Sequence, residues 1–386
     1  MKCRWLFCLA FIGSLCLGRE FARADADLVP SSWKEDVEPS GHKDDIVNKM
    51  GAAANNLNTS ATTASARKWF EDAASVNGDA TLASPAYRQL YGEALNKQFL
   101  SLLTNPKTAV RVRVNIAIIS SVVSVKLKTN ALLPTVLQLL NDKSDAVVLA
   151  AEKPAGNLLP SLFNQAKGDD RDNLLAAMVK SVADHSTPPM AGDIAQDAYK
   201  GMNPLIGNFQ VTGSDFDSIA KYNLDMQKAR LELYKTGSSG IPDSPVVDTY
   251  PSEFLLAASE WGQLQDPDKL RAIQQAVDLI SMAAQRAEKR SANQNDELIK
   301  TIDDEGYPLL QLAKETFKDA ACETAIQAVR QISVGSRPEA IETARAALFP
   351  ALHDAAANAP ILANLVAPPD LNGDAGTTPA PAAAAP

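Results

Sequence analysis

Few residues of this chain have the types and the spacing that catalysis requires. The three histidines, His42, His185 and His353, lie far apart in the sequence, and none belongs to an H-E-x-x-H or a Cys/His zinc pattern. The sequence also has no G-x-S-x-G elbow, no Walker-type phosphate loop and no G-x-G-x-x-G turn. We therefore expect a non-enzymatic protein without catalytic residues, cofactor or metal ion.

Two short patterns match motifs of penicillin-binding proteins and β-lactamases. Lys235-Thr236-Gly237 matches K-T-G, and Ser65-x-x-Lys68 matches the S-x-x-K nucleophile motif. Ser31-x-x-Lys34 and Ser218-x-x-Lys221 match S-x-x-K equally well, and the S-D-N element is missing. K-T-G belongs on a sheet strand, whereas Lys235 closes a helical pattern. We therefore do not assign this enzyme class.

Acidic clusters offer weak sites for cations. Asp370–Asp374 has the opening of a calcium loop, but Ala375 and Pro381 stand where such a loop needs Gly and a bidentate Glu. The groups at Asp169–Asp172 and Asp303–Glu305 are typical of solvated turns. None of these clusters predicts a metal site.

The N-terminus has the features of a secretion signal. A basic start precedes the apolar run Trp5–Gly18, and Ala22-Arg23-Ala24 fits the A-x-A cleavage rule, as does Ala24-Asp25-Ala26. The run is shorter than the ~20 residues that span a membrane. We predict that residues 1–24 are a cleaved signal, in preference to an uncleaved anchor or a buried helix. The mature protein is then exported to the bacterial periplasm or cell surface, without an integral membrane span.

Removal of the signal takes away most of the cysteine. Cys3, Cys8 and Cys16 lie within residues 1–24, which leaves Cys322 alone and excludes an internal disulfide framework. Cys322 shares helical spacing with the apolar residues that follow it, Ala325, Ile326 and Val329. This spacing favours a buried core thiol over an intermolecular bridge.

The chain is acidic, with a formal net charge of −9. Residues 1–24 carry four basic side chains and one acidic side chain, so their removal shifts the net charge to −12. Such a protein repels nucleic acid phosphates unless it has a local basic patch. The densest basic cluster, Arg286–Arg290, includes Glu288 and is typical of a solvated helix face. We therefore expect no nucleic acid partner.

Two segments near the middle of the first half match each other. Phe99–Val112 (FLSLLTNPKTAVRV) aligns with Val136–Leu149 (VLQLLNDKSDAVVL), and Leu103 falls on Leu140 at an offset of 37 residues. Each copy has an apolar helix end, a polar turn and a second apolar helix. A helix pair of this size buries its apolar face only by stacking on a neighbour.

The repeated features resemble HEAT repeats over residues 84–185. Leu-Leu-Pro occurs at 132–134 and again at 158–160. The pattern also includes an Asn-Asp turn and an Ala-Val pair where the next helix begins. The Arg that usually follows Ala-Val is present as Arg111, whereas Val148 replaces it in the second copy. The resemblance implies a stacked helical scaffold that binds other macromolecules, and it implies no catalytic residue.

The periodicity and the capping residues predict individual helices. Ser84 and Pro85 open a helix that ends at Leu103, and Pro154 ends or kinks a later one. The β-branched run 110–125 also fits a strand, and the repeat match favours a helix. The predicted helices are 44–55, 64–74, 84–103, 107–126, 129–140, 144–153, a third pair opening at 158–160 and ending at 184, 193–202, 215–234, one starting at 266, and one after a capping box at 336–339.

The predicted fold is all-α, with α-solenoid-like stacked helix pairs that continue into a further helical portion. The expected parts are a signal peptide (1–24), an extended lead-in with short helices (25–83), a HEAT-like region (84–235), a linker (236–250), a C-terminal helical region (251–366) and a disordered Pro/Ala-rich tail (367–386).

These features favour an exported scaffold or protein-interaction protein of the bacterial envelope, whose partner is another envelope protein. One alternative is a binding module for an envelope glycan or polymer, with a groove lined by Trp69, Tyr87, Tyr91 or Trp261. The other alternative is a hydrolase that uses two carboxylates converging across a cleft.

Overall fold

The computed structural model describes residues 28–58, 60–163, 168–203, 211, 213–236, 242–290 and 296–371. Within these ranges the regular structure is helical, apart from one isolated β-bridge between Val76 and Asp79. The prediction of an all-α protein is confirmed. The predicted signal at residues 1–24 lies outside the described residues.

The described helices range in length from the four-residue α14 to the 23-residue α15. The first half contains α2 (Ser31–Glu35), η2 (Pro39–His42), α3 (Lys43–Asn55), η3 (Asn56–Asn58), α4 (Ser60–Ala73), η4 (Ala80–Leu82), α5 (Pro85–Leu103), α6 (Val110–Leu127), α7 (Leu133–Leu140), α8 (Asp145–Phe163), α9 (Asp169–Asp184) and α10 (Ala191–Met202). The second half contains α12 (Ser214–Lys235), η5 (Pro245–Thr249), α13 (Tyr250–Leu255), α14 (Ala258–Trp261), α15 (Asp266–Glu288), α16 (Asp296–Leu312), the π-helical turn η7 (Ala313–Phe317), α17 (Ala320–Arg330), α18 (Pro338–Asp354), η8 (Ala355–Ala357) and η9 (Pro360–Asn364).

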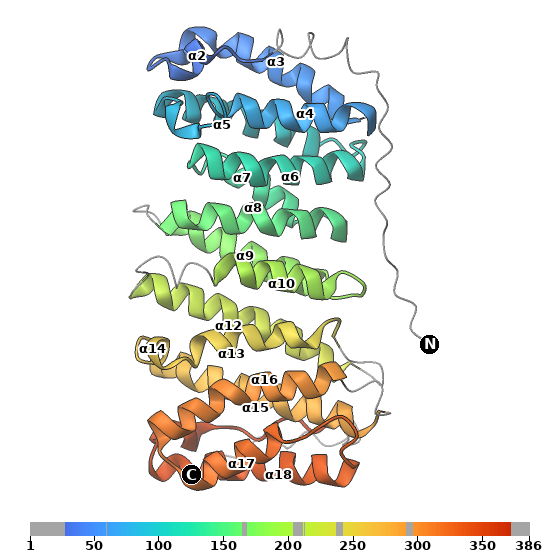
Figure 1. Cartoon of the computed structure of the whole chain (residues 1–386), viewed down its shortest axis with the longest axis vertical. Helices are drawn as coiled ribbons and strands as arrows, with labels where there is room; N and C mark the ends of the chain where they lie inside the picture. Colours follow the sequence, from blue (N-terminus) through green and yellow to red (C-terminus); the bar gives the residue numbers. More distant parts are fainter. Residues whose placement is uncertain are drawn as a thin grey trace, which may run out of the picture.

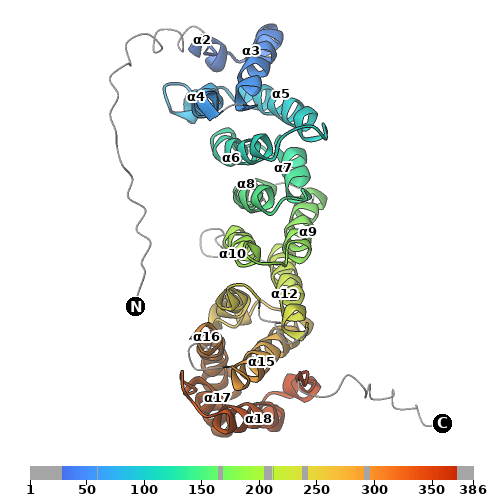
Figure 2. The same cartoon turned by 90° about the vertical axis from the view of Figure 1, so that its right-hand side faces the viewer.

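The helices succeed one another along the long axis of an elongated molecule, from α2 and α3 at one end to α17 and α18 at the other (Figure 1). Figure 2 shows two columns, with α4, α6, α8 and α10 in one and α5, α7, α9 and α12 in the other. Neighbours within a column pack against each other, as α6 does on α8 and α9 on α12. The apolar side chains between the columns form one hydrophobic core along the length of the molecule.

Local sequence signals placed several helix boundaries correctly. The Oγ of Ser84 accepts a hydrogen bond from the Tyr87 backbone N–H over 3.0 Å, so Ser84 caps α5 with Pro85 in its first turn. The β-branched run 110–125 lies within helix α6, as the repeat match predicted. Helix α15 begins at Asp266, and Cys322 is fully buried in α17.

The sequence predicted that Pro154 ends or kinks a helix, and the first of these two outcomes is wrong. Helix α8 continues through both Pro154 and Pro160, so Leu158 and Leu159 belong to it and do not open a third pair. Each internal proline removes a backbone hydrogen bond, at a cost of about 3 kcal/mol. Helix α8 packs against α6 on one side and α10 on the other, and the apolar burial there offsets this cost.

Two predictions near the C-terminus are also wrong. Ser336 does not form a capping box, because α18 starts at Pro338 and the Ser336 Oγ accepts from the Ser333 N–H over 3.0 Å. Residues 367–371 are not a free tail, since Gln285 binds their backbone. The remainder of the predicted tail, 372–386, lies outside the described residues.

Candidate binding groove

Three of the four aromatic residues expected on a binding surface are core residues. Tyr87 and Tyr91 have no exposed surface, and Trp69 is 9% exposed. The Tyr87 hydroxyl donates to the Ala73 carbonyl over 2.7 Å, and the Tyr91 hydroxyl donates to the Phe70 carbonyl over 3.0 Å. These rings join α5 to α4, so they stabilise the first helix layers and are inaccessible to a ligand.

The fourth, Trp261, is partly exposed in the short helix α14. The Lys269 ammonium lies 5.6 Å from its ring centroid, which is a cation–π distance. Trp261 does not line any of the hollows described below.

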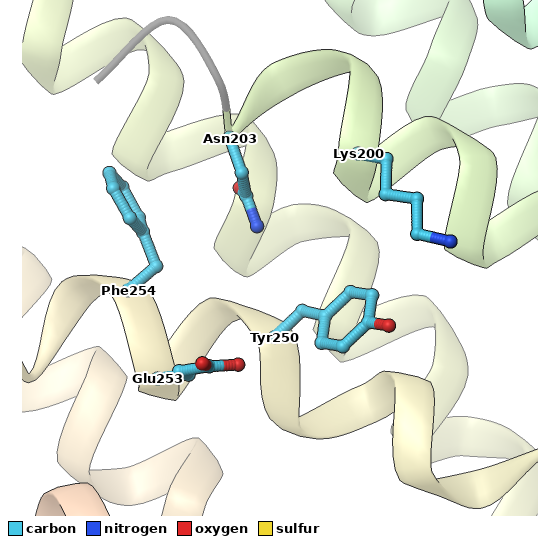
Figure 3. Close-up of a pocket in the computed structure, with 5 residues that line it drawn as sticks. All are labelled: Lys200, Asn203, Tyr250, Glu253 and Phe254. Carbon is cyan, nitrogen blue, oxygen red and sulfur yellow. The ribbon is translucent and has the colours of Figure 1, made fainter. Parts of the chain in front are cut away.

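A hollow of about 600 Å³ opens between α10 and α13. Figure 3 shows its lining: Lys200 and Asn203 from the end of α10 face Tyr250, Glu253 and Phe254 of α13. A second hollow of about 250 Å³ shares Tyr250. It is also lined by Gly192, Asp193, Gln196, Ser244, Val246, Val247, Glu297 and Lys300. The two hollows are named here the Tyr250 groove.

The rings of Tyr250 and Phe254 are supported by contacts with neighbouring side chains. They are four residues apart on α13, so they lie on one face of the helix. The Tyr250 ring packs edge-on against Tyr199 at 6.0 Å, and Phe254 lies 6.4 Å from Phe216. The Gln196 amide donates to the Tyr250 hydroxyl over 3.2 Å. Both rings therefore keep a defined orientation while part of each stays accessible.

Charges of both signs surround these rings. Lys200 and Lys300 are basic, whereas Asp193, Glu253 and Glu297 are acidic. A groove with two aromatic rings and a mixed polar rim suits a polypeptide or a sugar chain, because both combine apolar surface with hydrogen-bonding groups.

A buried ion pair fixes the segment that leads into α13. Arg230 of α12 is 1% exposed and Asp248 of η5 is fully buried. The Arg230 Nε donates to Asp248 Oδ1 over 2.7 Å, and the Tyr234 hydroxyl donates to Asp248 Oδ2 over 3.2 Å. The Arg230 Nη2 also donates to the Asp243 carbonyl, and Gln227 donates to the Asp248 carbonyl. These bonds anchor η5 to α12 and so set the position of α13.

The protonation of this pair follows from its donors. Burial alone would lower the pKa of Arg230, but the adjacent Asp248 carboxylate outweighs burial and raises it. Burial raises the pKa of Asp248, while Arg230 and the Tyr234 hydroxyl oppose that rise. Because these two groups direct hydrogen-bond donors at the one carboxylate, the geometry favours the ionised pair.

A second buried acid lies close to this pair. Glu305 of α16 is fully buried, and the Ser252 hydroxyl of α13 donates to its Oε1. Burial raises the pKa of Glu305 well above its ordinary value, although the Ser252 hydrogen bond opposes this, and the negative charge of Asp248 raises it further. The bond between Ser252 and Glu305 ties α13 to α16.

The hydrolase alternative needs two carboxylates on a cleft. Asp248 and Glu305 influence each other, yet both are fully buried and neither lines a hollow of the Tyr250 groove. A substrate seated in the groove would not contact either group.

The other residues with potential chemistry lie apart. The His185 Nδ1 is 2.6 Å from Asp145 Oδ1, His42 stacks on Trp33, and His353 lies beside Phe349. Within the described ranges, no three His, Cys, Asp or Glu side chains gather as metal ligands would.

The residues that match K-T-G and S-x-x-K do not lie in the structural setting that these motifs have in penicillin-binding proteins and β-lactamases. Lys68 of α4 pairs with Asp72, whereas Lys235 ends α12 and pairs with Glu232. K-T-G should lie on a strand, and residue 237 is outside the described part of the chain.

Sequence reasoning missed Tyr250 and Phe254. The Gly-, Ser- and Pro-rich stretch before them predicted a linker at 236–250, and the described part of it includes buried Asp248. The available signal was the i, i+4 spacing of two aromatic residues at the start of a helix that Pro251 opens.

Compared with protein-family models, curated proteins and solved structures, the chain matches none. Across the described ranges, no helix has the length and apolarity needed to cross a membrane.

Proposed function

We propose that this protein is an exported, non-enzymatic scaffold of the bacterial envelope that holds another envelope protein in the Tyr250 groove. The proposal includes a HEAT-like α-solenoid architecture, in which helix pairs from residues 84–185 stack and further pairs continue toward the C-terminus. The secretion pattern of residues 1–24 supports export, and the succession of helices along the long axis supports the stacked architecture (Figure 1).

The observation that carries the proposal is the arrangement of Tyr250 and Phe254. Their rings are rigidly supported, partly exposed and adjacent on one helix face that borders a hollow of about 600 Å³. Aromatic side chains with fixed orientation lose little conformational freedom on binding, so they are frequent anchors of protein interfaces. The mixed charges of Lys200 and Glu253 at the rim suit hydrogen bonds to a polypeptide.

A glycan is the second candidate ligand. Sugar rings stack on accessible aromatic faces, and the groove places polar side chains such as Gln196 and Asn203 around its rings. This candidate differs from the first only in the ligand, because both use the same groove.

Cross-linking from the groove tests the proposal. A photoreactive amino acid at Asn203 should trap one protein partner in envelope preparations, and Tyr250→Ala combined with Phe254→Ala should abolish that product. Tyr307→Ala is the matched control, since Tyr307 is 54% exposed on α16 and lines neither hollow of the groove. A partner that persists in the Tyr250 and Phe254 variant would contradict the proposal. Retention of the protein on purified envelope glycan, lost in the same variant, would favour the second candidate.

A further inference from the structure

The chain beyond η9 runs along α15 in an extended conformation. Leu365, at the start of this run, has φ −65° and ψ 140°, which is polyproline II geometry. Pro368 and Pro369 follow, and proline favours that geometry because its φ is fixed. Residues 366–371 are named here the strap.

Two glutamines of α15 hold the strap by its backbone. Gln274 binds Val366 twice: its amide donates to the Val366 carbonyl over 2.9 Å, and its Oε1 accepts from the Val366 N–H over 2.8 Å. Gln285 does the same further along, donating to the Pro369 carbonyl over 2.9 Å and accepting from the Leu371 N–H over 2.7 Å. Each side-chain amide therefore uses its nitrogen and its oxygen on main-chain groups, and the same nitrogen also donates to a side chain of α15, to Asp278 from Gln274 and to Ser281 from Gln285.

The spacing of the two glutamines matches an extended peptide. Gln274 and Gln285 are eleven residues apart, about three helical turns, so they share one face of α15 and lie ~16 Å apart along its axis. The six residues from Val366 to Leu371 are separated by five steps, which in polyproline II geometry also span ~16 Å. The strap and the helix run in the same direction. The spacing of the two glutamines therefore matches the spacing of the backbone groups that they bind.

The four hydrogen bonds from Gln274 and Gln285 go to backbone atoms, so they do not depend on the side chains of the strap. The Val366 side chain is 68% exposed, and only Pro368, Pro369 and Leu371 are partly buried. A further hollow of about 380 Å³ lies beside Val366 between α12 and α15, and the buried residues Leu231 and Met282 contribute to its lining. The strap leaves this hollow unfilled, so a longer or bulkier peptide has additional apolar surface to bury there.

We propose that this face of α15, with Gln274 and Gln285 as its two backbone clamps, is a binding site for an extended, proline-containing peptide of another protein, and that the strap is its intramolecular competitor. The strap shows which form of peptide the site accepts: an extended backbone, which its two adjacent prolines favour. The bonds between Gln274 and Val366 are solvent-exposed, so this end of the strap opens at low cost. Because the strap is tethered, it lowers the apparent affinity for a free peptide by the fraction of time that it occupies the site.

A fluorescent peptide with the sequence of residues 364–372 is the probe, and its polarisation is measured against the full chain. Leu371→Asp releases the strap, because it places a charge on a partly buried apolar position. The released protein should bind the peptide at least about tenfold more tightly than the unchanged protein. Adding Gln274→Ala and Gln285→Ala should remove this gain, whereas Gln327→Ala, at an exposed glutamine of α17, should leave it intact. A peptide with alanine at both proline positions should bind several-fold more weakly.

Two results would overturn the proposal. One is equal binding to the released and unchanged proteins, and the other is a gain that survives loss of both glutamines. Should Leu371→Asp lose its helical circular dichroism, Pro368→Ala with Pro369→Ala releases the strap without adding a charge, and the same comparisons apply. A dimer of the unchanged protein that disappears in the released variant would also contradict it, since the occupant would then be the strap of a second copy.

Discussion

Arg230 and Asp248 form an ion pair across 2.7 Å with almost no access to solvent, 18 residues apart in the chain. The pair joins α12 to η5, which leads directly into the helix that carries Tyr250. The Tyr250 groove therefore depends on an interaction that is closed to solvent.

Removal of one partner of this pair should strongly destabilise the protein. Arg230→Met leaves the Asp248 carboxylate buried without its counter-ion, and we expect a loss of about 3–5 kcal/mol in the free energy of unfolding. Arg230→Met combined with Asp248→Leu should cost less than either change alone, because no unpaired charge remains. Urea denaturation of the three variants measures both values. Additive losses would contradict the coupling.

Glu152 should make stability depend on pH. It is fully buried in α8, and burial raises its pKa to about 8, although a hydrogen bond from Ser181 opposes the rise. The Ser181 hydroxyl has a single proton and also lies 2.7 Å from the Met178 carbonyl. A protonated Glu152 can donate to the Ser181 oxygen while Ser181 donates to the Met178 carbonyl, so each of the two protons has an acceptor.

The direction of this pH dependence follows from the protonation of Glu152 in the folded and the unfolded protein. The ordinary pKa of a glutamate is 4.5, and that of Glu152 in the folded protein is about 8. Between these two pH values the folded protein retains a proton on Glu152 that the unfolded chain has released. Stability therefore falls as pH rises through this window, by at most about 1.4 kcal/mol per pH unit from this group. Glu152→Gln should become progressively more stable than the unchanged protein from pH 5 to pH 8, as measured by melting temperature. Glu253→Gln, at an exposed position, is the control. Parallel pH profiles for the Glu152 variant and the unchanged protein would refute this.

Gly156 should not tolerate a side chain. A Cβ at Gly156 of α8 would lie 2.7 Å from the Cα of Gly201 in α10, and backbone cannot move aside as a side chain can. We expect Gly156→Ala to cost about 1–3 kcal/mol, since the two helices must separate. Gly51→Ala in α3 meets open space and should stabilise by about 0.5–1 kcal/mol through helix propensity. Equal effects of the two substitutions in thermal unfolding would show that the helix crossing is not tight.

Thiol titration should report both burial and export. Burial raises the pKa of Cys322 to about 12, so the native protein should react with a thiol reagent only as fast as it unfolds. In denaturant, the exported protein should titrate with one thiol, because Cys3, Cys8 and Cys16 leave with the signal. Four thiols would mean that residues 1–24 are retained, and the mass of the intact chain distinguishes cleavage after residue 24 from cleavage after residue 26.

Local signals were reliable where a boundary depends on neighbours in the chain. Ser84 caps α5 and Asp266 begins α15 because capping and first-turn preferences act within a few residues. The face of Cys322 was also correct, since helical periodicity alone places it among apolar side chains.

The same local rules failed where contacts between helices decide the outcome. Pro154 does not end α8, because packing against α6 and α10 outweighs the lost hydrogen bond. Tyr87 and Tyr91 were predicted to line a groove, yet α4 covers them and its carbonyls accept hydrogen bonds from their hydroxyls.

The sequence by itself determined the helical class of the fold, most of the helices in the first half and the acidic character of the chain, because these follow from residue type and short-range spacing. Only the tertiary structure decided which aromatic rings are accessible, that Asp248 meets Arg230, and that the strap meets Gln274 and Gln285 some ninety residues earlier in the chain. The physical reason is that burial and pairing depend on which helices become neighbours in space, and that arrangement is a sum of many weak contacts that no single motif records.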